Sequence, residues 1–217
     1  MSDAKKNLLG IDEDQPTNWF EPLYARGKVD GAGVPWANMA THPCFLRWLA
    51  SNNLDSAGKT ALVVGCGMGD DAIELESLGF QVTAFDVSST AVDYCNKRFP
   101  DAKSEFVQAD LLQDNETWTG KFDFVLEIYT VQALPPKYED TLINNIAKFV
   151  APKGQLLVVA EVSQQERHYK NGPPWLLTPA HVDKFVASGL AVTGSKIEQA
   201  SLEGGSESYV TLFARVV

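Results

Sequence analysis

The sequence has no apolar run approaching the roughly 20 residues that span a bilayer as a helix. Its first fourteen residues are polar, carry acids as well as Lys5 and Lys6, and contain no apolar signal-peptide segment. We therefore expect a cytoplasmic protein with no membrane contact.

Basic residues are scarce. The chain has 18 Lys and Arg against 28 Asp and Glu, a formal charge of −10, and no cluster of Lys and Arg. A nucleic-acid binder needs a basic face to displace counterions from phosphates, so we expect no nucleic-acid partner.

Cysteine and histidine are also few. Three cysteines lie far apart with no CxxC motif, which favours reduced thiols over a disulfide framework. His42 and Cys44 alone are too few for a zinc site, and His168 and His181 fall at no recognisable ligand spacing. We expect no metal.

The chain divides by pattern into two parts. Residues 1–40 are rich in Trp, Pro and Gly and have no sustained periodicity, so they predict an irregular aromatic arm or lid, or an arm that only packs its tryptophans on the core. Residues 41–217 suit one domain. No exposed apolar helix or heptad is evident, so a monomer is expected.

Strands and helices alternate through the second part. Helices are expected at 43–51 (with Thr41 as N-cap), 70–78, 89–98, 138–150 and 178–188, and strands at 60–65, 81–86, 105–108, 122–127 and 155–160. Two further β-rich runs, 191–198 and 209–217, flank a Gly-Gly pair and predict a hairpin. The pattern indicates an α/β fold: a doubly wound, mostly parallel sheet with helices on both faces and one antiparallel C-terminal strand.

A glycine-rich turn connects the first of these strands to its helix. Gly65-Cys66-Gly67-Met68-Gly69 lets the backbone turn sharply and lets a ligand approach closely. A dinucleotide fold would have its third glycine at position 70. Asp70 and Asp71 stand there instead, and two carboxylates would repel a pyrophosphate but tolerate a cationic, phosphate-free ligand such as S-adenosylmethionine.

Acidic residues follow the next two strands. Asp86 ends the second strand about 20 residues beyond the first glycine, where it would accept both ribose hydroxyls; the alternative is a helix N-cap by Asp86 or Ser88. Asp110 would accept the adenine amino group while Leu111 covers the ring; the alternative is an Asp that caps its own turn.

The fourth strand ends in Glu127 and is followed by Tyr129, which would form a neutral wall, contact the transferred methyl group or simply pack in the core. The long segment 161–175 is a candidate substrate cover. Within it Arg167 and His168 would hold an anion or take a proton, although Arg167 also suits a solvated surface.

Over residues 60–217 the order of these motifs resembles the class I S-adenosylmethionine-dependent methyltransferases. The resemblance implies a seven-stranded Rossmann-like sheet with an antiparallel last strand, S-adenosylmethionine as cofactor and S-adenosylhomocysteine as product. It also implies site roles: Gly65, Cys66, Gly67 and Gly69 at the methionine part, Asp86 at the ribose, Val87, Asp110 and Leu111 around the adenine, and Glu127 near the methionine amino end.

Three segments are similar to the thiopurine and halide/thiol methyltransferases: residues 19–24 with 34–36, residues 132–138, and residues 172–175. In that group the aromatic arm folds over the cofactor, which implies a role there for Trp19, Tyr24 and Trp36. Tyr24 and Tyr129 become the candidates for contact with the reacting groups. The acceptor implied is a small molecule: a thiol, thiopurine, halide or metalloid. Residues 127–130 lack the Asp-Arg pair of the thiopurine branch.

Two other functions share this pattern. One is a nicotinamide-dependent oxidoreductase, which Asp70 disfavours. The other is a non-catalytic protein that binds S-adenosylmethionine as a sensor or for a partner enzyme. For a methyltransferase, an in-line displacement on an anionic thiolate or halide would need little help from a general base.

Overall fold

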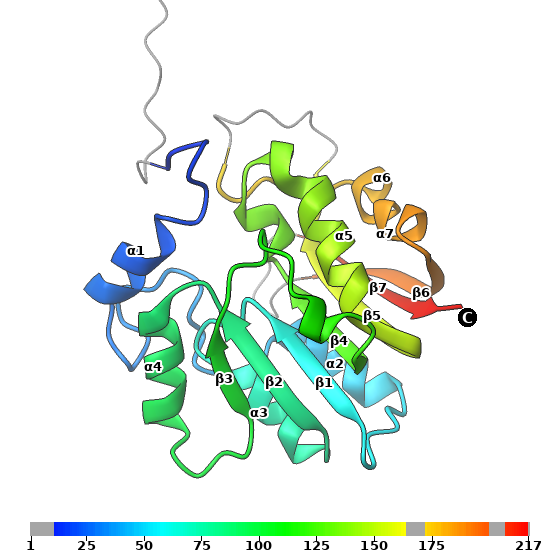
Figure 1. Cartoon of the computed structure of the whole chain (residues 1–217), viewed down its shortest axis with the longest axis horizontal. Coiled ribbons are helices and arrows are strands. Elements are labelled where there is room, and N and C mark those ends of the chain that lie inside the picture. The colour runs from blue at the N-terminus through cyan, green and yellow to red at the C-terminus, as the bar shows by residue number, and fades with distance from the viewer. Residues whose placement is uncertain (1–10, 164–171, 200–206, 217) are drawn as a thin grey trace, which may run out of the picture.

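A computed structural model describes residues 11–163, 172–199 and 207–216 (Figure 1). Its centre is a seven-stranded sheet with the order β3-β2-β1-β4-β5-β7-β6. The strands are β1 (Thr60–Val64), β2 (Gln81–Asp86), β3 (Glu105–Gln108), β4 (Phe122–Ile128), β5 (Val150–Glu161), β6 (Leu190–Gln199) and β7 (Glu207–Arg215).

The first five strands are parallel, and only β7 runs antiparallel to its neighbours, β5 and β6. This confirms the predicted seven-stranded Rossmann-like sheet with an antiparallel C-terminal strand. The strand order reverses at β1, because β2 lies on one side of it and β4 on the other. The carboxyl ends of these strands therefore form the crevice in which α/β sheets bind ligands.

Helices cover both faces of the sheet (Figure 1). Ala61 and Val63 of β1 pack with α2 (Pro43–Ser51), α3 (Asp70–Ser77) and α4 (Ser89–Arg98). Leu62 and Val64 point to the other face, toward α5 (Glu139–Phe149), α6 (Pro179–Val182) and α7 (Lys184–Ala187). Alternate side chains of one buried strand thus enter two separate cores.

Several local predictions need correction. The arm contains a helix, α1 (Phe20–Arg26). The N-cap of α2 is His42 rather than Thr41, because the His42 ring accepts a hydrogen bond from the Cys44 amide. The helix predicted at 178–188 is two short helices, because backbone bonds such as that from Val186 N to Asp183 O close tighter turns.

Strand β5 begins at Val150 rather than at 155, directly after α5. The Gly-Gly turn of the hairpin, residues 204–205, lies outside the described residues. Within the described part of the chain, none of the helices is long and apolar enough to cross a membrane.

Candidate functional site

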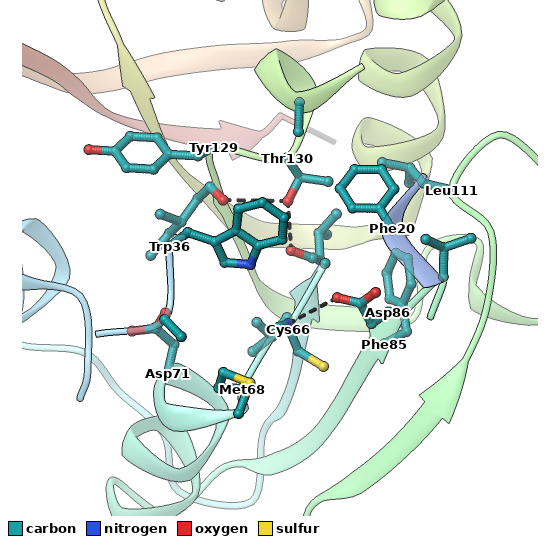
Figure 2. Close-up of a pocket in the computed structure, with 18 of the residues that line it drawn as sticks. Phe20, Trp36, Cys66, Met68, Asp71, Phe85, Asp86, Leu111, Tyr129 and Thr130 are labelled. Atoms are coloured by element: carbon teal, nitrogen blue, oxygen red, sulfur yellow. Dashed lines mark hydrogen bonds between the residues drawn. The ribbon is translucent and has the colours of Figure 1, made fainter. Parts of the chain in front are cut away.

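A cavity of about 560 Å³ lies at the carboxyl ends of β1, β2 and β4. The glycine loop after β1 and the end of β2 form its floor, and residues 17–40 of the arm contribute its roof. Figure 2 shows Phe20, Phe85, Asp86 and Leu111 at one end, and Trp36, Asp71 and Tyr129 at the other. We call these the Asp86 end and the Asp71 end.

The glycine loop turns sharply because Gly65, Gly67 and Gly69 have left-handed backbones, with φ of 61°, 54° and 89°. A Cβ on Gly65 would lie 2.6 Å from Thr130 Oγ1. A Cβ on Gly67 would lie 3.2 Å from the Tyr24 hydroxyl, at the roof. Because these positions have no Cβ, the backbone of the loop itself forms the cavity wall, and a larger residue there would contact Thr130 or Tyr24.

Cys66 lines the cavity from the same loop. Its amide donates a 2.7 Å hydrogen bond to Phe85 O, which ties the loop to β2. A hydrogen bond with Cys95 and burial raise the pKa of the Cys66 thiol well above its ordinary value. The neutral thiol is therefore part of an uncharged wall.

Asp86 is buried at the end of β2, and main-chain donors surround its carboxylate. One oxygen accepts from Gly67 N at 3.0 Å and the other from Ser88 N at 2.9 Å. Burial raises the pKa of Asp86 to about 6, against the lowering effect of these bonds. The N-cap of α4 is Ser88, whose hydroxyl accepts from Ala91 N, so Asp86 does not cap the helix.

The remaining residues predicted around the adenine, Val87, Asp110 and Leu111, line the same end of the cavity. Asp110 also caps its own turn, accepting from Leu112 N at 2.9 Å. Phe20 from the arm lies beside Leu111 (Figure 2). This end therefore combines flat apolar walls with two carboxylates.

The roof is aromatic. Trp19, Tyr24 and Trp36 all line the cavity, and their contact with a cofactor stays a prediction. Trp36 Nε1 donates a 2.9 Å hydrogen bond to the Tyr24 hydroxyl, and the two rings pack edge to face. Burial and the nearby Asp86 raise the pKa of Tyr24 well above its ordinary value, so this hydroxyl stays neutral.

Sequence reasoning missed Glu21, which fastens the roof to the domain. Its carboxylate accepts from Ser88 Oγ and from Thr90 Oγ1, both at 2.6 Å, and from Thr90 N at 3.2 Å. These bonds lower the pKa of Glu21. The available signal was the run of hydroxyl residues at the start of a predicted helix, where an anion is stabilised.

The two aspartates after the glycine loop have different surroundings. Arg98 of α4 binds both oxygens of Asp70 at 2.7 Å, so the charge of Asp70 is neutralised within the protein. The repulsion of a pyrophosphate expected from two carboxylates therefore rests mainly on Asp71. Asp71 accepts from the backbone amide of His42 at 2.8 Å and lies on the cavity wall. Burial raises its pKa to about 7.

Tyr129 lines the Asp71 end with its ring, while its hydroxyl pairs with Ser208 Oγ of β7 at 2.8 Å. Burial raises the pKa of Tyr129 to about 12. The His42 ring packs edge to face against the Tyr129 ring, with 5.0 Å between the ring centroids. Burial and Arg47 lower the pKa of His42 to about 4, so it is neutral at physiological pH. Sequence reasoning considered His42 only as a metal ligand.

Glu127 does not line the cavity. Its side chain is buried, 1% exposed. Its Oε1 accepts hydrogen bonds from Thr130 N at 2.7 Å and from Val131 N at 3.0 Å, so it stabilises the turn after β4. Burial raises its pKa to about 7. Its predicted contact with the methionine amino end stays a prediction.

The cover segment enters the cavity wall at its two described ends, through Glu161 and through Pro173 and Pro174. Gln132 holds the first end, donating to Glu161 Oε2 at 3.1 Å and accepting from Glu161 N at 2.8 Å. Arg167 and His168 lie outside the described residues.

Comparisons with known proteins agree with this geometry. Residues 61–154 match a protein family described as a methyltransferase domain. A probable thiol methyltransferase 2 from Arabidopsis thaliana is 24% identical over 159 residues, which are 72% of this chain and 68% of that protein. A fatty-acid O-methyltransferase from Mycolicibacterium smegmatis is 29% identical over 143 residues, 63% of this chain and about half (51%) of that protein.

Among solved structures, a protein described as converting a disulfide bond into a thioacetal group during echinomycin biosynthesis superposes with a TM-score of 0.74. The match covers 92% of this chain and 93% of that one at 18% identity, so it speaks for the fold alone. Strand order, glycine loop and family match agree: residues 61–154 form a methyltransferase domain, and the chain has the fold of the class I S-adenosylmethionine-dependent methyltransferases.

Proposed function

We propose that this enzyme methylates a thiol of a small molecule inside the cavity. The observation that carries the proposal is the charge of the wall: the described lining residues include five carboxylates and no Lys or Arg. A halide or a carboxylate acceptor would find no counter-charge among them, whereas a neutral thiol needs none. The relative named a thiol methyltransferase supports sulfur as the accepting atom.

The size and closure of the site also favour a small acceptor. A cavity of about 560 Å³ is in the range of small-molecule sites. Trp19, Tyr24 and Trp36 roof it and would exclude water from the reacting groups. The hydroxyls of Tyr24 and Tyr129 are engaged with Trp36 and Ser208, so these residues would act as neutral walls.

The residues present fit S-adenosylmethionine. Gly67 leaves open the space that a Cβ would fill, and its neighbours Gly65, Cys66 and Gly69 would lie along the methionine part. The wall carboxylates suit a ligand whose sulfonium and amino groups are positive. When bound, the cofactor supplies an electrophilic methyl group.

Asp86 would accept the ribose hydroxyls, since each of its oxygens keeps a lone pair beyond the bond to a main-chain amide. Val87, Asp110 and Leu111 would frame the adenine. Glu127 would act near the methionine amino end by fixing the turn at Thr130, which lines the cavity.

The test is to incubate the protein with S-adenosylmethionine and one acceptor at a time, and to measure S-adenosylhomocysteine and the methylated product. 2-Mercaptoethanol represents a neutral thiol, and iodide and a fatty acid represent anionic acceptors. We expect product from a thiol and less from either anion. Transfer to iodide or the fatty acid but to no thiol would contradict the proposal.

A further inference from the structure

We propose that Asp71 takes the proton of the acceptor thiol as the methyl group is transferred. This inference rests on the proposed function. Asp71 lies in the first turn of α3 and lines the cavity on the same side as Tyr129 (Figure 2). The nucleoside part of the cofactor belongs at the opposite end, with Asp86. The acceptor must therefore approach from the side of Asp71.

One oxygen of Asp71 is held and the other is available. Oδ1 accepts from His42 N at 2.8 Å, which fixes the carboxylate against the start of α2. Oδ2 has no hydrogen-bond partner among the described residues. Among the other wall carboxylates, Arg98 binds both oxygens of Asp70, two amides hold Asp86, and Gln132 binds Glu161. Asp110 also has one oxygen held by an amide, that of Leu112, but it lies next to Leu111 at the Asp86 end.

The two titratable rings at this end, those of His42 and Tyr129, are poor proton acceptors. The His42 ring accepts the Cys44 amide proton on Nδ1 at 3.3 Å, so its own proton is on Nε2 and the ring has no free acceptor. Its pKa of about 4 also makes it a weak base. The Tyr129 hydroxyl is neutral and bonded to Ser208.

The surroundings of Asp71 give it suitable basicity. Burial is the largest influence on its pKa, the His42 amide opposes it, and the charges of Asp70 and Glu74 on α3 add to it, giving a pKa of about 7. Arg98 is paired with Asp70, and His42 is neutral. Asp86, Asp110 and Glu161 are the other carboxylates on the cavity wall. A group with a pKa near the working pH is the most effective general base.

The step balances. The thiol sulfur forms a bond to the methyl carbon, and the bond from that carbon to the sulfonium sulfur breaks, leaving its electron pair on the departing thioether. The thiol proton passes to Oδ2 of Asp71. A thiol with a pKa near 8.5 is mostly protonated at neutral pH and needs this acceptor, whereas a thiol that is already ionised does not.

The test compares wild type, Asp71→Asn and Glu74→Gln with 2-mercaptoethanol, which is protonated near pH 7, and 4-nitrothiophenol, which is already a thiolate. Asparagine keeps an oxygen for the His42 amide but takes no proton. We expect Asp71→Asn to slow methylation of 2-mercaptoethanol by about 100-fold or more and to leave 4-nitrothiophenol within a few-fold. Glu74→Gln removes a charge that raises the pKa of Asp71, so the acid limb of the rate profile should move to lower pH.

A second measurement, which needs no catalytic turnover, accompanies the rate comparison. Thermal midpoints of wild type and Asp71→Asn are measured from pH 5.5 to 8.5, with and without S-adenosylhomocysteine. The wild type should lose stability relative to the variant as the pH rises through about 7. A constant difference between the two proteins would overturn the inference, as would equal slowing of both thiols with weakened S-adenosylhomocysteine binding. If wild type methylates no thiol, the proposed function fails and this role for Asp71 fails with it; a thiol-active wild type with an unchanged Asp71→Asn profile overturns the role alone.

Discussion

The floor and the roof of the cavity are held in different ways. In the floor the contacts are largely main chain: Cys66 N binds Phe85 O at 2.7 Å, and Ala109 N binds Asp86 O at 3.0 Å. In the roof they are side chain: Glu21 binds the start of α4, and Trp36 binds Tyr24. Tyr94 adds hydrogen bonds to the carbonyls of the arm.

The difference matters for binding. Floor contacts belong to the strands and turns of the sheet, so changing them disturbs the fold. Roof contacts join the short helix α1 to α4 and can break while the sheet stays folded. We therefore expect floor substitutions to lower global stability and roof substitutions to act on ligand affinity.

The largest effect is expected at Gly69. Its φ is 89°, and a Cβ there would lie 2.9 Å from Cys95 Sγ and 3.1 Å from Phe106. Gly69→Ala should lower the free energy of unfolding by about 4 kcal/mol, since backbone strain and overpacking add. Gly58→Ala is the matched control: its φ is 72°, but no atom lies within 4 Å, so about 1 kcal/mol is expected. Equal losses in urea denaturation would contradict the account of the floor.

A second effect concerns Glu127 and pH. Its pKa is raised from 4.5 to about 7 in the folded protein, so its contribution to stability is full below pH 4.5 and is lost as the pH rises through about 7. Glu127→Gln does not titrate. Its free energy of unfolding relative to wild type should therefore increase by about 3 kcal/mol between pH 4.5 and pH 8. A difference that stays constant across this range would show that Glu127 does not titrate there.

The roof should show a smaller effect. Glu21→Ala removes four hydrogen bonds to a charged group, worth about 2 kcal/mol in arm closure. We expect S-adenosylhomocysteine to bind roughly 30-fold more weakly, with a nearly unchanged thermal midpoint of the free protein. Isothermal titration calorimetry measures the first and calorimetric melting the second. A large drop in the midpoint with unchanged affinity would reverse the assignment of floor and roof.

The smallest effect is expected at the arm's exposed ion pair, between Asp14 and Lys137 at 2.7 Å. The Asp14 side chain is 88% exposed, so solvent screens the pair. Asp14→Asn should leave ligand affinity and thermal midpoint unchanged. A loss of affinity like that of Glu21→Ala would mean that the arm responds to any loss of charge.

The sequence predicts the floor well because its signals are local. The bounds of β2, α4 and β3 agree with the predicted ranges, and each element is short. The glycine loop joins β1 to α3 as expected. The number of strands follows from the alternation and the final hairpin, whereas their order in the sheet comes from the structure.

The contacts of the roof and the partners of the carboxylates were harder to predict from the sequence, because they depend on contacts between distant residues. The pairing of Asp70 with Arg98 spans 28 positions, and that of Glu21 with Ser88 spans 67. Which oxygen of Asp71 is held and which is free depends on where the fold places the His42 amide. Glu127 has the strand-end position expected of a ligand contact, yet its side chain turns under the next loop.

The most direct test of the central claim is a thermal-shift titration with S-adenosylhomocysteine on wild type and on Asp86→Ala, with NAD as control. At about 100 times its dissociation constant the ligand should stabilise wild type by roughly 2.7 kcal/mol, a shift of several degrees. We expect this shift in wild type, its loss or strong reduction in Asp86→Ala, and no shift with NAD. No shift with S-adenosylhomocysteine, or a larger one with NAD, would contradict it.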